Sequence, residues 1–321
     1  MYRTGIARLA VATALIAAVA APIPMSRGRA ATGAAGHLYV QRGDYIYAAN
    51  ADGSNAHQVT RTGTATMPDI EPAVSPDGTM LAYARQDGKN IKGSRIYVVP
   101  VAGGTARSIA SGYLTGNPSW SPNGQRIAYD LSFNCYIPSL TGGTGFFAFE
   151  FVVAVNAVAT GKKVDYSGCP VGSQYFAPTY TPDGAHIVAG DYEHNDQTRK
   201  DYIALTLLKI PGKSQDYPVI FEGDRRHDYL SPAVSPNGDA IACVRVGVGQ
   251  LHARGSLRVV QGNGTGEREV ATDVDSDFRP AWAPDGKTIA FSCGGSVYTV
   301  PATGGRPTLV LSNAKNPAWG R

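Results

Sequence analysis

The sequence contains no long helical pattern beyond its first residues, and it carries few charges. Only 17% of its 321 residues are charged, whereas 43% are hydrophobic. A chain of that hydrophobicity can bury a large core, which excludes an intrinsically disordered polymer. The 38 glycines, 21 prolines and 17 tyrosines supply turns and strand-forming aromatic residues. This composition predicts an all-β protein made of many short strands.

Common catalytic and nucleotide-binding motifs are also missing. The sequence has no G-x-S-x-G, no H-E-x-x-H and no P-loop. It therefore lacks the motifs for the serine nucleophile of α/β-hydrolases, for a zinc site with two histidines on one helix, and for binding nucleotide phosphates. No basic run is interleaved with aromatic residues either, so nucleic acid is not an expected partner.

No apolar run is long enough to span a membrane, which takes roughly 20 residues. The run at 9–21 has 13 residues, with Arg3 and Arg8 nearby and a small-x-small site at 18–20. This pattern predicts a signal peptide over 1–20, followed by a disordered leader over 21–36. Removing 1–20 leaves 27 basic against 25 acidic residues, a net charge of +2. We therefore expect a secreted or periplasmic protein of the cell envelope that does not span the membrane.

A repeated turn sets the expected architecture. Its form is Ser, Thr or Ala, then Pro, then Asp or Asn, then Gly; Pro presets φ and Gly accepts φ > 0. A short Pro-containing strand precedes each turn and an alternating strand follows it, which predicts a hairpin. The turn occurs in five segments that align without gaps: 71–85, 117–131, 177–191, 231–245 and 279–293.

Two further strands follow each hairpin, and four antiparallel strands per repeat predict a β-propeller. The first repeat lacks its innermost strand, while the C-terminal NPAWGR has only that strand. We therefore expect six blades, with 316–320 completing the N-terminal blade and so removing a sheet edge that would otherwise be left open. The expected blades are 37–60 with 316–321, 71–110, 117–165, 177–221, 231–272 and 279–312.

These repeats resemble a known family. The segment RPAWAPDGKTIAF at 279–291, with the later Gly-Gly turn at 304–305, is similar to the WD40-like (PD40-type) propeller repeat of the TolB type. The resemblance covers 37–321 and implies a six-bladed propeller in the bacterial envelope or secreted space. TolB proteins carry a separate N-terminal α/β domain. Because the first blade follows the leader directly, neither that domain nor a Tol–Pal role is expected here.

Only four cysteines are present. Cys135 and Cys169 fall on neighbouring expected loops, which makes them a candidate disulfide in an exported chain. Cys243 replaces an aromatic residue of the repeat, so we expect a buried thiol there. A bond between Cys243 and Cys293 is not expected, because it would need their Cα atoms within about 7 Å.

The variation in loop length should gather on one face of the propeller. The turns on the other face are short and uniform, and elaborated loops on a rigid scaffold usually carry binding. Unconstrained drift of surface loops is the alternative. We expect a protein, peptide or envelope glycan to dock on the variable-loop face and at the channel mouth. The variable segments are 86–94, 131–149, 166–176, 191–201, 222–230 and 246–255.

Charged residues in two places are candidates for that binding face. One sector holds three histidines on separate loops with neighbouring charges, and it could support a metal-assisted lyase or hydrolase. Nothing in the spacing forces these imidazoles to converge, and solvated loop tips are the alternative. The sector comprises His194, Arg225, Arg226, His227, Asp228 and His252.

The second place is the channel mouth, just before the innermost-strand prolines. A ring of charges there could hold a cation or a basic side chain of a partner, or it could be a hydrated rim. Apart from such a cation, no cofactor, no resident metal and no catalytic residue is predicted. The leading hypothesis is a monomeric, non-enzymatic binding or scaffold propeller. The candidate residues are Asp69, Glu71, Asp228, Asp277 and Arg279.

Overall fold

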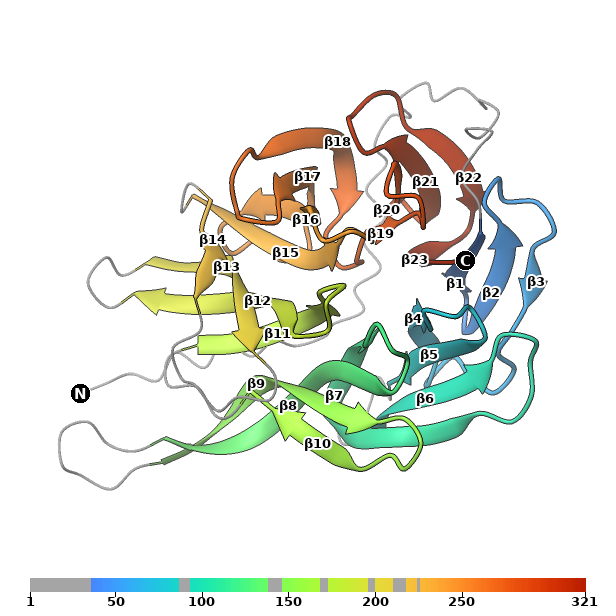
Figure 1. The fold of residues 1–321 in the computed structure, drawn as a ribbon, viewed down its shortest axis with the longest axis horizontal. Helices are drawn as coiled ribbons and strands as arrows, with labels where there is room; N and C mark the ends of the chain where they lie inside the picture. Colours follow the sequence, from blue (N-terminus) through green and yellow to red (C-terminus); the bar gives the residue numbers. More distant parts are fainter. Residues whose placement is uncertain are drawn as a thin grey trace.

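The computed structural model places a set of small sheets around a common centre (Figure 1), which is the arrangement of a β-propeller. All of its named elements are β-strands, as the sequence predicts. No helix among the described residues is long and apolar enough to be a membrane span. The expected signal peptide and all of the expected leader except Gly36 lie outside the described residues. The structure describes residues 36–86, 93–137, 146–167, 173–195, 200–209, 218–223 and 226–321.

The first sheet is built from both ends of the chain. Its order is β23-β1-β2-β3, with antiparallel pairing of β23 and β1 that places Trp319 opposite Leu38. Figure 1 shows the dark-blue β1 beside the dark-red β23. The NPAWGR segment therefore pairs with the segment predicted from the repeat pattern. The strands are β1 (His37–Arg42), β2 (Tyr45–Asn50), β3 (His57–Gln58) and β23 (Lys315–Gly320).

The next sheet has seven strands in the order β10-β9-β8-β7-β6-β5-β4, where two separate blades were expected. The reason is β7, which pairs with β6 through its first half and with β8 through its second half. The expected link at 111–116 stays extended and so continues the ladder. The strands are β4 (Asp69–Val74), β5 (Met80–Arg85), β6 (Ser94–Pro100), β7 (Arg107–Trp120), β8 (Arg126–Ile137), β9 (Phe146–Ala157) and β10 (Lys163–Tyr166).

Three four-stranded sheets complete the fold, each with its strands in chain order. The first contains β11 (Ser173–Tyr180), β12 (His186–Asn195), β13 (Lys200–Lys209) and β14 (Val219–Phe221). The second contains β15 (His227–Val234), β16 (Ala240–Gly247), β17 (Arg254–Gln261) and β18 (Arg268–Asp275). The third contains β19 (Ala281–Trp282), β20 (Thr288–Cys293), β21 (Ser296–Pro301) and β22 (Thr308–Ser312).

The repeated turn forms as its sequence predicts. In the first copy the amide of Gly78, at φ 73°, donates to the Ser75 carbonyl over 2.9 Å. The Ser75 hydroxyl donates to Asp77 Oδ1 over 2.6 Å and accepts the amide of Met80. Bonds from the Ser75 hydroxyl and then from Thr79 lower the pKa of the Asp77 carboxyl. The copies with Ser or Thr at this position make the same hydroxyl bond to the backbone, whereas the copy with Ala283 keeps the bond from the Lys287 amide to Asp285 Oδ1.

Hydrophobic cores lie between neighbouring sheets. Between the first and second sheets, Ile46 packs with Leu81 and Tyr83. Cys243 is completely buried in another such core, as predicted, and both Cys243 and Cys293 are free thiols. Cys169 and the side chain of Cys135 lie outside the described residues, so the candidate disulfide stays a prediction.

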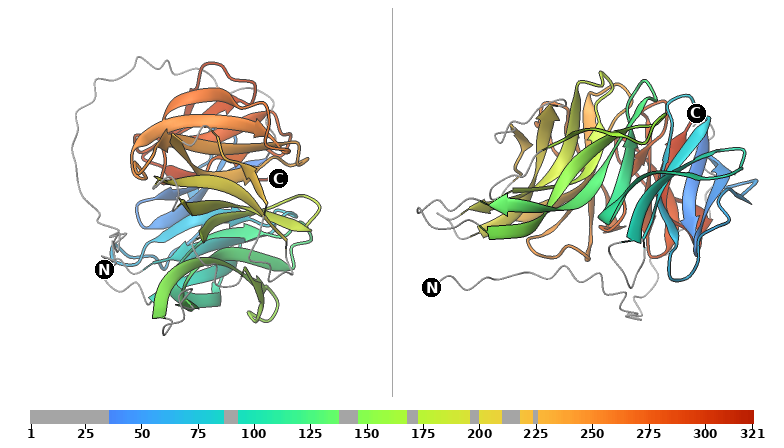
Figure 2. Two further views of the ribbon diagram at one scale, coloured as in Figure 1. Left: turned by 90° about the vertical axis from the view of Figure 1, so that its left-hand side faces the viewer. Right: turned by 90° about the horizontal axis from the view of Figure 1, so that it is seen from below.

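Two segments expected as loops are largely strands. In the 131–149 segment, β8 runs to Ile137 and β9 starts at Phe146, with these two residues paired. In the 191–201 segment, β12 and β13 pair as far as Asn195 and Lys200. Continuing a hairpin satisfies backbone groups that a loop would leave to water. Figure 2 shows β8 and β9 as long strands that reach one side of the fold, as β12 and β13 of the neighbouring sheet also do.

Two tryptophans of the innermost strands differ in the hydrogen bonding of their indole N–H groups. This difference predicts that replacing them will lower the free energy of unfolding by unequal amounts. Trp120 Nε1 donates to the Ala73 carbonyl over 3.0 Å, whereas the buried Trp319 Nε1 has no hydrogen-bond partner among the residues that the structure describes. Trp120→Phe should therefore cost about 1 kcal/mol more than Trp319→Phe, because only the first change removes a hydrogen bond. Urea denaturation of both variants measures the difference. Equal losses of unfolding free energy in the two variants would show that the Trp120 hydrogen bond does not stabilise the protein.

Candidate binding site at the channel mouth

The residues before the repeated prolines lie on or beside the innermost strands and differ in backbone conformation. Five have φ between 50° and 55°, a left-handed conformation that side chains disfavour, whereas Arg279 does not. Such strain persists only where surrounding contacts hold it. The five are Glu71, Asn117, Ala177, Ser231 and Asn316.

The left-handed conformation directs backbone amides to side chains of the preceding repeat. The amide of Asn117 donates to Glu71 Oε2 over 2.6 Å, and the amide of Ala177 donates to Asp130 Oδ1 over 2.7 Å. The amide of Asn316 donates to Ser292 Oγ over 2.8 Å. These bonds connect successive repeats close to the axis.

Asp130 is the centre of a polar cluster that also contains Asn117 and Glu71. Its carboxyl is 6% exposed and accepts a second hydrogen bond from Asn117 Nδ2, 2.8 Å from Oδ2. Burial raises the pKa of Asp130 to about 7, although the bond from Asn117 opposes the shift. Burial also raises the pKa of Glu71. Both acids therefore sit where ionisation is costly.

Arg279 completes the cluster from another part of the ring. Its Nη1 approaches the carbonyl of Pro118 on β7, at 3.5 Å. The buried Nε and Nη2 have no hydrogen-bond partner among the described residues. Burial lowers the pKa of Arg279, and the charges of Asp130 and then Glu71 oppose that shift. An Arg with unsatisfied buried donors beside two carboxylates is a polar site whose hydrogen bonds the described residues do not complete.

The structure brings together only part of the expected channel-mouth ring. Glu71 and Arg279 join the cluster. Asp69 is completely buried and pairs with Arg85 at 2.7 Å, so it is not available to a docking partner. Asp228 is 2% exposed and accepts the amides of Ile203 and Gly249. These two acids hold loops in place.

The histidine sector is only partly assembled among the described residues. His252 Nδ1 lies 2.6 Å from Asp277 Oδ1, and both side chains are exposed. His227 is half-buried and Arg226 is exposed. Arg225 and the side chain of His194 lie outside the described residues. Within the described ranges, no three His, Cys, Asp or Glu side chains are placed to hold a metal ion.

Sequence reasoning missed Asn117 and Asp130. The repeat alignment contained the signal for Asp130, because the equivalent positions hold Ala84, Gly190, Val244 and Ser292. A carboxylate at an otherwise small or apolar position of a buried strand marks a polar function. Asn117 was visible only as the residue before Pro118, and its contact with Asp130 depends on how the strands curve.

The chain is similar in sequence and in fold to several known proteins. No family model matches the chain. An uncharacterised protein of Agrobacterium fabrum is 23% identical over 269 residues, covering 79% of this chain and 80% of the relative. The Tol-Pal system protein TolB of Gluconobacter oxydans is 35% identical over 104 residues, covering 28% of this chain and 22% of TolB. The matched segment is thus a small part of that protein's length.

The crystal structure of TolB from Acinetobacter baumannii superimposes with a TM-score of 0.66 at 19% identity, covering 89% of this chain and 67% of that one. The protein is a TolB-like β-propeller. At that identity the likeness describes the fold, and what TolB does in the Tol-Pal system is not transferred by it. The channel cluster of the TolB-like propeller has to be interpreted from its own residues.

Proposed function

We propose that this TolB-like propeller has six blades and a closed ring. In support, each innermost strand contacts the next in the order β23, β4, β7, β11, β15, β19 and back to β23. The seven-stranded sheet then counts as two blades that share β7. Pairing with β23 covers an edge of β1 that would otherwise stay open.

We propose that the protein is an exported, non-enzymatic binding or scaffold module that docks a protein or peptide at the channel mouth. The observation that carries this proposal is Arg279, whose Nε and Nη2, buried beside Glu71 and Asp130, have no hydrogen-bond partner in the part of the chain that the structure describes. Charged donors and acceptors held on rigid strands favour specific recognition of a polar partner. The proposal that the protein is exported rests on the expected signal peptide. Export would place its partner in the cell envelope.

The variable-loop face would supply the outer part of the docking surface. The long strands β8 and β9 would extend that surface outward (Figure 2). His252 and Asp277 are exposed and contact each other, so they could bond to a partner at the rim. A rigid ring with such elaborations on one face resembles other scaffolds that bind through loops.

The test is quantitative capture of partners from envelope extracts with an Arg279→Met variant. We expect a loss of about tenfold in capture, because the change removes the charged donors but retains the side-chain length. Arg107→Met is the matched control, since Arg107 is exposed at the start of β7. Replacing 134–149 by Asn-Gly, which keeps the pairing of Phe133 with Glu150, tests the hairpin separately. Unchanged capture by both test variants would refute docking at this face.

A further inference from the structure

A groove lies along the junction between the first sheet and strands β5 and β6, away from the channel cluster. Its volume is about 630 Å³, within the usual range of small-molecule sites. It is lined by residues 57–62 and 101–106 with Tyr83, Arg85, Tyr97 and Val99.

The outer strand of the first sheet, which borders the groove, is short. β3 has two residues, whereas the outer strands β18 and β22 have eight and five and β14 has three. Tyr97 on the neighbouring strand β6 is half-buried. An aromatic ring and aliphatic side chains consequently form part of the lining.

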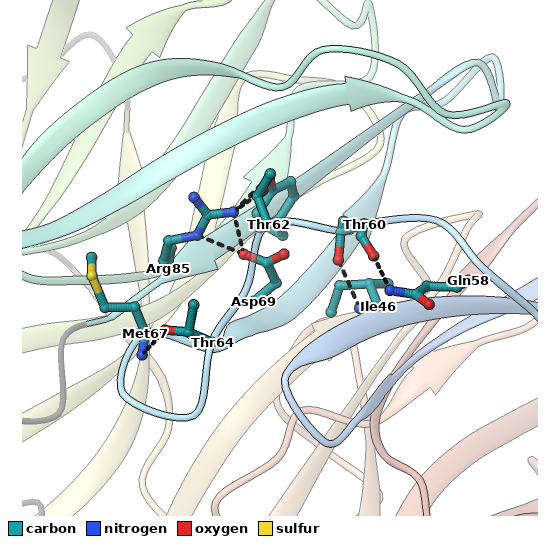
Figure 3. Close-up of polar contacts among 9 residues, drawn as sticks. Ile46, Gln58, Thr60, Thr62, Thr64, Met67, Asp69 and Arg85 are labelled. Atoms are coloured by element: carbon teal, nitrogen blue, oxygen red, sulfur yellow. Dashed lines mark hydrogen bonds and ion pairs between the residues drawn. The ribbon is translucent and has the colours of Figure 1, made fainter.

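Arg85 is held rigidly at one end of the groove (Figure 3). Its Nε donates to Asp69 Oδ1 over 2.7 Å, and Nη2 donates to Thr62 Oγ1. Its guanidinium carbon lies 4.6 Å from the centre of the Tyr97 ring. The Arg85 side chain is 12% exposed and Asp69 is 0% exposed. The third nitrogen, Nη1, has no hydrogen-bond partner among the described residues.

The opposite wall is also fixed before any ligand arrives. Thr60 Oγ1 accepts the amide of Ile46 over 2.9 Å, and Gln58 Nε2 donates to the Thr60 carbonyl over 2.8 Å (Figure 3). Preformed walls reduce the entropy that a ligand must give up on binding.

The charges of the lining have one sign. The groove contains Arg61, Arg85 and His57, and none of its lining residues is Asp or Glu. Arg61 and His57 are exposed at the rim. Asp69 neutralises part of the Arg85 charge from behind, but its carboxyl is buried and does not line the groove. The groove is therefore complementary to an anionic ligand.

We propose that this groove binds an acidic sugar, with the carboxylate at Arg85 and Arg61 and the sugar ring against Tyr97 and Val101. A fixed guanidinium recognises a carboxylate, and a sugar offers both an apolar ring face and hydroxyl groups. Gln58, Thr62 and Thr105 supply hydrogen-bonding side chains for those hydroxyls. The site does not depend on docking at the channel mouth.

Calorimetry with three probes tests the ligand class. We expect the full chain to bind trigalacturonate at least tenfold more tightly than its neutral methyl ester. Trigalacturonate should also bind more tightly than tri-glutamate, because the peptide brings carboxylates without sugar rings. Equal binding of acid and ester, or tighter binding of the peptide, would overturn the proposal.

Two variants test the location. Arg85→Met combined with Asp69→Asn removes both charges of the buried pair, so that neither is left uncompensated, and should weaken trigalacturonate binding about tenfold. Arg61→Gln changes only an exposed side chain and should weaken it about threefold, while Arg107→Gln should have no effect. If the double variant does not fold, Arg61→Gln decides: affinity equal to wild type rules the site out.

Discussion

Deleting residues 316–321 is expected to lower the melting temperature by at least about 10 °C. The deletion removes all of β23 except Lys315, including buried Asn316 and Ala318 and the partly buried Trp319 that packs on Leu38 and Ala281. Truncating a core Trp alone typically costs 3–5 kcal/mol, and roughly 2–4 °C is lost per kcal/mol in a domain somewhat smaller than this one. Scanning calorimetry measures the change.

The size of this effect depends on where β23 pairs. Its removal would expose the inner edge of β1 and uncover two hydrophobic cores at once. Deleting only Arg321, which follows β23 and is exposed, is the matched control and should leave the melting temperature unchanged. A six-residue deletion as stable as this control would show that the two ends of the chain do not hold the ring together.

Asp130→Asn is expected to abolish most of the fall in stability between pH 5 and pH 8. In wild type the pKa of Asp130 is raised to about 7, above the value of about 3.9 in an unfolded chain. An acid with a raised folded pKa stabilises the protein fully below its unfolded pKa, and this contribution is lost as pH rises through the folded pKa. Over pH 5 to 8 the loss amounts to about 3 kcal/mol.

The Asn side chain should fit this position. Its oxygen can still accept the amide of Ala177, and the Asn117 amide can turn to present its oxygen to the new amide group. Because Glu71, Asp69 and Asp228 also have raised pKa values, a residual slope of the same sign should remain. Urea titrations at several pH values measure the free energy of unfolding.

Asp77→Asn is the matched control for this experiment. Asn already occupies the equivalent turn position at Asn123 and Asn237, so the fold should tolerate it. The pKa of Asp77 is lowered, so its contribution is lost only as pH falls below the unfolded value, outside the pH 5 to 8 range. A wild-type slope retained in Asp130→Asn would contradict the assignment of the titration to Asp130.

The strands of the propeller were predictable because their signals are local. A turn such as Ser75-Pro-Asp-Gly closes with hydrogen bonds from its own side chains. The segments on either side of it are therefore expected to be the two strands of a hairpin. The pairing of NPAWGR with the N-terminal segment was also predictable, since each end supplies the strands that the other lacks. The lengths of the strands were less predictable. β8 and β9 continue into a segment expected as a loop, because each strand lengthens by pairing with the other and no turn residue marks where they end.

The candidate binding sites could be predicted only in part. Glu71 and Arg279 were chosen because they precede repeat prolines, yet Asp69, chosen by the same logic, is buried against Arg85. Whether a charge faces a channel or a core depends on twist and on small bulges, and one residue of shift reverses the side-chain direction.

By itself the sequence determined the all-β class, the repeated unit and the pairing of the two chain ends, because turns and alternation act over a few residues and repeat along the chain. Only the tertiary structure decided which charges meet. The approach of Arg279 to Pro118, and the groove between His57 and Tyr97, join residues that are distant in sequence. Such contacts depend on how whole sheets stack around the axis, and no local pattern in the chain encodes that geometry.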